Sequence, residues 1–208
     1  MIEYLQQTPV ASIIFIFTLV TSIYAFNDSS LYGKFMLHPY SIYRKRNIYT
    51  LITSGLVHGS WMHLIFNMFT FYFFAFALEN QLGSLRFGIV YFLGLILSDI
   101  PSVLKHKNDF HYHSLGASGA ISAVLFSFIL FYPLTTLMIF PLPIPIWAAV
   151  FGVLYLVYSY YMSKGSRDNI NHDAHLYGAI TGVIITILLV PGIIPHFIAE
   201  IAARFGAY

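Results

Sequence analysis

The chain has 208 residues, of which 58% are apolar and only 9% are charged. An ordinary soluble domain carries about 25% charged residues, so the composition excludes a soluble globular protein and indicates a membrane protein. The net charge of +2 is spread over several loops and indicates no nucleic-acid partner, and the absence of cysteine excludes disulfides, thiolate nucleophiles and cysteine-ligated zinc.

Uncharged apolar runs predict the membrane-crossing helices, because a hydrocarbon core of about 30 Å needs roughly 20 helical residues. Proline clusters and charged turns divide these runs into separate helices. The sequence predicts an all-α membrane protein with six transmembrane helices in one domain over residues 1–208, with spans at about 10–26, 61–78, 86–99, 118–132, 146–162 and 172–190.

Two other segments are expected to be ordered at the membrane surface. The long connection 27–60 contains many aromatic residues beside the basic sequence YRKR, so we expect a structured first loop. Residues 196–206 are too few to cross the bilayer. They place Glu200 and Arg204 four residues apart, opposite apolar side chains, and this pattern predicts an interfacial helix.

Four polar side chains stand out within the predicted spans, namely His63, Asn67, Ser118 and His175. A polar side chain in a membrane helix is costly and indicates function by default. His63 and Asn67 are four residues apart, so they lie on the same face of the second span.

Ser118 lies in the sequence GASGA, at the start of the fourth predicted span. Gly116 permits a bent approach to the helix that exposes backbone N–H groups, and Gly119 lets another backbone come close. A serine in this position suits an attacking hydroxyl beside a site for the oxyanion that it creates. Taken alone, however, Gly-x-Ser-Gly is a weak pattern, since small residues on membrane helices more often form a packing surface.

His175 shares a face of the sixth span with Gly178 and Gly182. The two glycines remove side-chain bulk, so another helix can approach and bring a partner to His175. His172, one turn earlier, is expected to lie beside His175. Asp173 lies on the wrong face of the helix to orient the His175 ring.

Four motifs occur in a specific order along the chain: HGSWMHLIFNM (58–68), ALENQLGS (77–84), GASGA (116–120) and AHLYGAITG (174–182). In this order and on these predicted helices, they resemble the motifs of rhomboid intramembrane serine proteases. The resemblance covers about residues 10–190 and is far more specific than GxSG alone.

The resemblance implies a serine endopeptidase that cleaves transmembrane segments of other membrane proteins with a Ser-His dyad, without a cofactor or metal. It implies that Ser118 is the nucleophile and His175 the general base. It also implies that Asn67, His63 and the backbone N–H of Ser118 face the oxyanion, and that Gly116 shapes the turn before the nucleophile. The expected location is the plasma membrane of a bacterium.

The sequence departs from the family pattern at two places. Tyr49 and Thr50 stand where many rhomboids carry a Trp-Arg pair, and Ser122 stands where an aromatic residue commonly stacks on the catalytic histidine. Other side chains must therefore orient the His175 ring. In addition, the family topology puts most Lys and Arg residues outside, against the positive-inside tendency.

Two alternatives compete with the protease. A metal transporter could use His63, His172 and His175 as ligands, because neutral imidazole binds zinc or nickel; this alternative leaves GASGA unexplained. A catalytically weak or inactive rhomboid-like protein could bind membrane segments without cleaving them. Such a protein would be expected to lose the serine or the histidine, and this chain has both.

Overall fold

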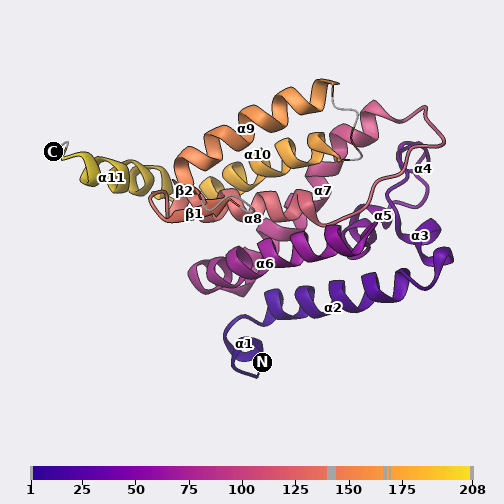
Figure 1. Cartoon of the computed structure of the whole chain (residues 1–208), viewed down its shortest axis with the longest axis horizontal. Coiled ribbons are helices and arrows are strands. Elements are labelled where there is room, and N and C mark those ends of the chain that lie inside the picture. Colours follow the sequence, from indigo (N-terminus) through magenta and orange to yellow (C-terminus); the bar gives the residue numbers. More distant parts are fainter. Residues whose placement is uncertain (1, 140–143, 166–167, 169, 207–208) are drawn as a thin grey trace.

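The computed structural model describes residues 2–139, 144–165, 168 and 170–206. It is mostly helical, and the helices pack side by side (Figure 1). The helices are α1 (Ile2–Gln7), α2 (Pro9–Ala25), α3 (Ser29–Phe35), α4 (Pro39–Tyr43), α5 (Thr50–Thr53), the 3₁₀ helix η1 (Ser54–Leu56), α6 (Trp61–Leu82), α7 (Ser84–Lys105), α8 (Ser118–Phe131), α9 (Ala148–Gly165), α10 (His172–Leu189) and α11 (Ile193–Phe205).

Three of these helices, α6, α7 and α10, are long and apolar enough to cross a membrane, and α2 and α8 are shorter apolar helices. The chain is therefore an integral membrane protein. Exposed large apolar side chains cover the outer faces of α2, α6 and α9, as expected for surfaces that face lipid.

Three helices extend beyond their predicted ends, of which the fifth span continues from 162 to Gly165. The second span continues from 78 to Leu82 and ends at Gly83, whose φ of +75° makes the turn. The third continues through Pro101 to Lys105. Ser102 and Val103, which follow the proline, are buried. Packing against the bundle therefore keeps this segment helical, although local propensity alone predicts that the helix ends before Pro101.

A β-hairpin departs from the predicted all-α fold. Strands β1 (Thr136–Ile139) and β2 (Ile144–Trp147) pair antiparallel, with Thr136 opposite Trp147 and Ile139 opposite Ile144. The proline-rich sequence here cannot continue a helix, and its apolar residues form strands instead. For this reason the fifth helix begins at Ala148, later than the predicted 146.

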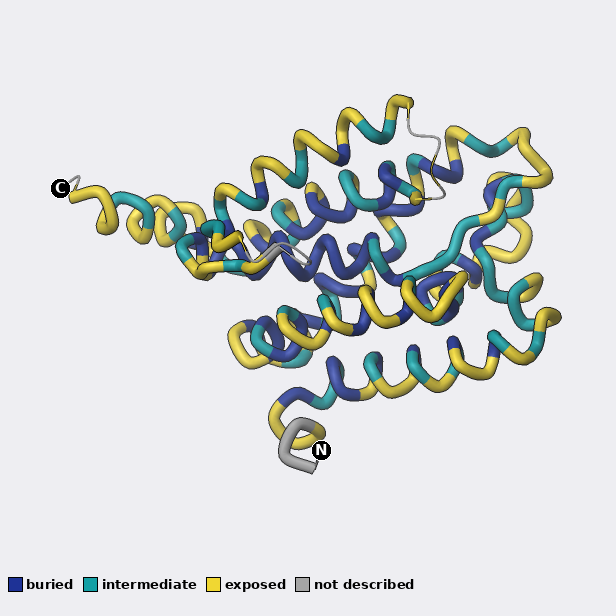
Figure 2. The backbone as a smooth tube through the Cα atoms, viewed as in Figure 1, coloured by how far each residue is buried: buried dark blue, intermediate teal, exposed yellow. Residues whose placement is uncertain are grey.

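Helix α8 forms the centre of the bundle (Figure 2). Every residue from Gly119 to Phe131 is buried, and α6, α7 and α10 surround the helix. Helix α9 lies at the periphery (Figure 1) and buries only Ala148, Gly152 and Ser159 among its described residues. The short central helix is thus held by protein contacts on all sides.

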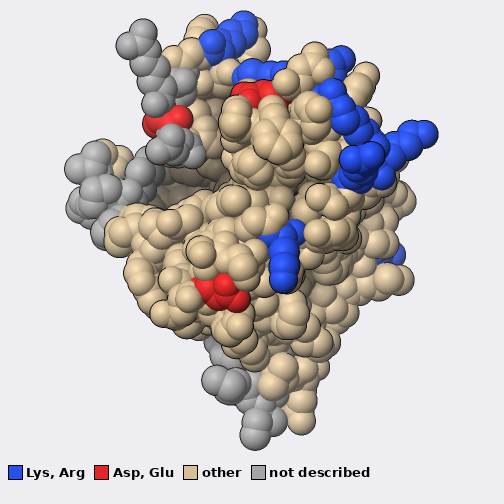
Figure 3. Space-filling view, turned by 90° about the vertical axis from the view of Figure 1, so that its right-hand side faces the viewer, with Lys and Arg blue, Asp and Glu red and all other residues tan. Residues whose placement is uncertain are grey.

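The first loop folds over one end of the bundle and reaches the chain that leads into α8. Leu37 and Ser114 form an antiparallel bridge, with backbone N–O distances of 2.8 and 3.1 Å. The Ser54 carbonyl accepts a hydrogen bond of 2.9 Å from the Gly116 N–H. Lys and Arg residues gather at this end of the molecule (Figure 3), where Arg44 donates to the Lys107 carbonyl.

Glu79 joins α2 to the end of α6. Its side chain is 1% exposed, and its two carboxyl oxygens accept from the backbone N–H groups of Val10 and Ala11 at 3.1 and 2.6 Å. The first N–H groups of a helix have no partner within the helix, so Glu79 satisfies two of them at the start of α2.

Glu79→Ala is expected to lower the free energy of unfolding by about 1–3 kcal/mol, because it leaves buried N–H groups of α2 without a partner. Denaturation in mixed detergent micelles measures this change. The matched control is Asn80→Ala, at the exposed neighbouring position. Equal losses in the two variants would show that Glu79 does not hold α2.

Candidate active site

Ser118 is the first residue of α8 and is half-buried. Ala117 precedes it without a side-chain cap, and the first backbone hydrogen bond of the helix runs from Ile121 N–H to the Ala117 carbonyl at 2.9 Å. The N–H groups before Ile121 therefore have no partner within the helix. The Ser118 hydroxyl thus lies beside backbone donors that can stabilise negative charge.

Gly116 passes directly against the ring of His63. Its φ is +111°, and a Cβ atom at this position would lie 2.7 Å from both Nε2 and Cε1 of His63. Only glycine fits such a backbone without strain. The Gly59 N–H donates a long hydrogen bond of 3.5 Å to His63 Nδ1, which leaves the proton on Nε2, the nitrogen beside Gly116.

Asn67 lies one turn after His63 on the same face of α6. Its amide nitrogen donates to the His63 carbonyl at 2.9 Å, and its buried Oδ1 makes no well-aligned hydrogen bond to a described residue, although the side chain lies close enough to His58 to act on that ring. The ring of His58 packs edge-on against His63, with centroids 4.9 Å apart. Burial, reinforced by the neighbouring His63, lowers the pKa of His58 to about 3, so His58 is neutral at physiological pH.

His175 lies in the first turn of α10, where α10 crosses α8 in close contact. A methyl group at Gly178 would overlap the Gly119 carbonyl oxygen, and one at Gly182 would overlap the carbonyl of Ala123. A methyl group at Gly119 would in turn overlap the Ser98 hydroxyl. Gly178 and Gly182 thus let α8 and α10 meet at backbone distance, and Gly119 leaves room for the Ser98 side chain of α7. Ser118 directly precedes Gly119 on α8, and His175 lies one turn before Gly178 on α10.

No hydrogen bond joins the Ser118 hydroxyl to the His175 ring within the described part of the chain. Catalytic hydrogen bonds are often long before substrate binds. The His175 ring instead contacts two aromatic rings. Tyr155 of α9 stacks on it with centroids 6.2 Å apart and planes 24° apart, and His172 meets it edge-on at 5.9 Å.

The two acidic residues near His175 have other partners. Asp173 forms an ion pair of 2.8 Å with Lys105 of α7. His172 Nε2 lies 3.1 Å from both carboxyl oxygens of Asp168. His172 therefore lies beside His175, as expected, and neither carboxyl group bonds to the His175 ring.

Asn171 connects the start of α10 to the chain before Ser118, a role that the sequence analysis missed. Its Oδ1 accepts from the Ala174 N–H at 3.0 Å and so caps α10. Its Nδ2 donates to Ser114 Oγ at 3.2 Å, and Ser102 Oγ donates to Oδ1 at 3.1 Å. Asparagine before an apolar helix is a signal for a cap, which could have identified this residue.

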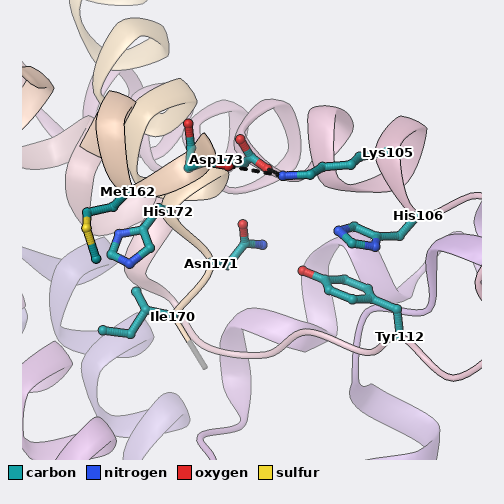
Figure 4. A pocket seen from close by; sticks show the side chains of 9 residues that line it. Lys105, His106, Tyr112, Met162, Ile170, Asn171, His172 and Asp173 are labelled. Atoms are coloured by element: carbon teal, nitrogen blue, oxygen red, sulfur yellow. Dashed lines mark hydrogen bonds and ion pairs between the residues drawn. The ribbon is translucent and has the colours of Figure 1, made fainter. Parts of the chain in front are cut away.

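A cavity of about 190 Å³ adjoins this network at the ends of α7, α9 and α10 (Figure 4). His172 and Met162 line one side of it, and His106 and Tyr112 line the other, with Asn171 between them. Within the described ranges no group of three or more His, Asp and Glu side chains could hold a metal ion.

A model of the rhomboid domain matches residues 45–192, which include all four motifs. The protein YdcA of Bacillus subtilis, whose name assigns it provisionally to the rhomboid proteases, is 34% identical over 140 residues, 67% of this chain and 66% of that protein. RHOMBOID-like protein 12, mitochondrial, of Arabidopsis thaliana is 25% identical over 175 residues, 76% of this chain and 51% of that protein. The chain spans less than two thirds of the length of either relative. The match over most of the chain confirms the resemblance found in the sequence: the chain belongs to the rhomboid family.

Proposed function

We propose that the protein is an intramembrane serine endopeptidase that cleaves transmembrane segments of other membrane proteins. The contact between α8 and α10 supports this proposal most strongly. It brings the start of α8, with Ser118 and its free backbone N–H groups, beside the first turn of α10, with His175. We further propose that α2, α6, α7, α8, α9 and α10 are the six spans, in a bacterial plasma membrane.

The proposed reaction uses Ser118 and His175 as one unit. The Ser118 oxygen attacks the carbonyl carbon of the substrate peptide bond while a ring nitrogen of His175 takes the hydroxyl proton. When the carbon–nitrogen bond breaks, the imidazolium gives this proton to the leaving amine. Water then attacks the carbonyl carbon of the acyl-serine ester while His175 takes a proton from that water. When the bond between this carbon and the Ser118 oxygen breaks, His175 returns the proton to the serine oxygen, which releases the new carboxyl end and regenerates Ser118.

The groups around Gly116 would stabilise the oxyanion of the tetrahedral intermediate. The candidate donors are the Ser118 N–H, the Nε2–H of His63 and the amide of Asn67, which has a second hydrogen beyond the one donated to His63. Fixed donors in a site of low dielectric constant stabilise developing charge more strongly than water does. This set of donors suits the stabilisation of a charged intermediate, which forms when a peptide bond is cleaved but not when a membrane segment is only bound.

The length of α8 supports cleavage within the membrane. A helix of 14 residues is about 21 Å long, shorter than a hydrocarbon core of about 30 Å. If the C-terminal end of α8 lies at the inner boundary of the hydrocarbon core, then Ser118 at its other end lies below the outer boundary. The chain that leads into α8 then brings polar residues down to the depth of the site. A transmembrane segment that unwinds near its outer end could meet Ser118 there, so substrates with helix-weakening residues are favoured.

Ser118→Ala and His175→Ala are each expected to abolish cleavage of a model membrane-anchored substrate and labelling by a fluorophosphonate probe. The double variant should be hardly worse than either single variant, because the two residues act as one unit. Unfolding midpoints serve as the control for folding. Cleavage by Ser118→Ala would exclude this mechanism, and binding of substrates without cleavage or labelling by the wild type would support the inactive-binder alternative.

Asn67→Ala is expected to reduce kcat by about 10²- to 10³-fold, the usual effect of removing one oxyanion donor, with little change in KM. His63→Ala should show a smaller defect of the same kind, and the two effects should not add, because they serve one charge. Steady-state kinetics of the purified protein measures both. A lowered unfolding midpoint with full kcat would instead assign Asn67 to helix packing.

Orientation can be measured with single cysteines, because the chain has none of its own. The family topology predicts that a cysteine at exposed Ser30, at the end that carries the candidate site, reacts with an impermeant maleimide added to intact cells. A cysteine at exposed Asn80, at the other end of α6, should react only after the cells are opened. The opposite pattern would support the positive-inside tendency and a site that opens to the cytoplasm.

A further inference from the structure

Tyr155 connects the His175 ring to the body of α8 through its own ring and its hydroxyl. The ring stacks on His175, with centroids 6.2 Å apart, within the range of offset aromatic pairs. The hydroxyl lies 2.7 Å from Ser122 Oγ. Tyr155 therefore contacts the candidate base with one part of its side chain and the helix of the candidate nucleophile with another.

The hydrogen bond between Tyr155 and Ser122 has a defined direction. Ser122 Oγ donates its single hydrogen to the Ser118 carbonyl at 2.8 Å, so the Tyr155 hydroxyl must be the donor to Ser122. The resulting chain leads from the Tyr155 hydroxyl through Ser122 to the backbone of Ser118. Consecutive hydrogen bonds of this kind strengthen one another.

Further contacts hold the Tyr155 ring in place. Phe126 of α8 and Phe151 of α9 pack against it, with centroids 5.5 and 5.8 Å away. Gly152, one turn before Tyr155, has no side chain to separate α9 from Ile129, so α9 lies close to α8. The tyrosine ring is thus a fixed surface against which another ring can be oriented.

We propose that Tyr155 is a positioning residue that sets the plane of the His175 ring toward Ser118, with Ser122 as its anchor; this inference rests on the proposed function. A histidine side chain has a broad preference at its second side-chain torsion, so the backbone alone does not fix the ring. No hydrogen bond from a described residue holds the His175 ring. The stacked face of Tyr155 and the edge contact of His172 supply the missing restraint.

The location of Tyr155 on α9 also makes the orientation of His175 depend on the placement of α9. Helix α9 exposes most of its surface and meets the bundle along one stripe, where Ala148, Gly152 and Ser159 are buried. Tyr155 lies three or four residues from its neighbours in this set, so it belongs to the same face of the helix. A shift of α9 away from α8 would remove the ring from His175 and break its bond to Ser122. The base is correctly oriented only when α9 is in place.

The test compares Tyr155→Leu with Tyr155→Phe in the purified protein. Tyr155→Leu removes the stacked ring and is expected to lower kcat about 2- to 12-fold, the rate equivalent of one aromatic pair, with KM and the unfolding midpoint little changed. The rate of fluorophosphonate labelling at Ser118 should fall by a similar factor, because labelling also requires the base. Tyr155→Phe keeps the ring and should retain most of the activity.

A double-mutant cycle tests the anchor. Ser122→Ala and Tyr155→Phe each remove the same hydrogen bond, so each is expected to cause a similar small loss of kcat, and the double variant should be no worse than either. Tyr161→Leu is the matched control, because Tyr161 lies on the same helix but is 68% exposed. It should retain the wild-type labelling rate.

The outcomes separate the positioning role from the proposed function. If the wild type labels and cleaves while Tyr155→Leu does so at an unchanged rate, the positioning role is overturned and the protease remains. If Tyr155→Leu slows cleavage of membrane substrates but not labelling, Tyr155 acts on substrate access, which also overturns it. If the wild type neither labels nor cleaves, the proposed function itself fails, and the inference fails with it.

Discussion

The close contact between α8 and α10 is the constraint on which the rest of the structure depends. Glycine at 119, 178 and 182 lets backbone meet backbone, and any side chain at these positions would separate the helices that meet there. In lipid, where apolar surface gains little from burial against another helix, such close packing is a main source of association. The same contact brings the Ser118 end of α8 to the His175 end of α10, so stability and the proposed chemistry share one interface.

The loops extend this arrangement to the oxyanion side. Leu37 and Ser54 of the first loop bond to the chain before Ser118, and Asn171 bonds to it from the start of α10. The chain that enters α8 is therefore fixed from two directions, with Gly116 against His63. A preorganised site needs this kind of support, because donors that must first move stabilise charge less well.

The sequence was sufficient to predict the membrane class, the rhomboid family and the approximate bounds of the main helices, and it singled out the residues that we propose for the site. Apolar runs, glycine spacing and polar residues in lipid are local signals, and each appears directly in the order of residues. The helix through Pro101 and the β-hairpin near Trp147 could not be predicted in this way, since tertiary packing and strand pairing decide them. Tyr155 is the clearest example. It is one of several tyrosines in α9, and only the packing of α9 on α8 singles it out for Ser122 and His175.

The enclosure of α8 has a consequence for how the surrounding bilayer can act on the protein. A bilayer thinner or thicker than the apolar surface acts on the helices that touch lipid, which tilt or shift to match it. Helix α8 is covered by protein along Gly119–Phe131, so lipid cannot act on it directly. The depth of Ser118 relative to its neighbours is then set by protein contacts, whereas the exposed apolar faces of α2, α6 and α9 are the surfaces on which a change in bilayer thickness would act.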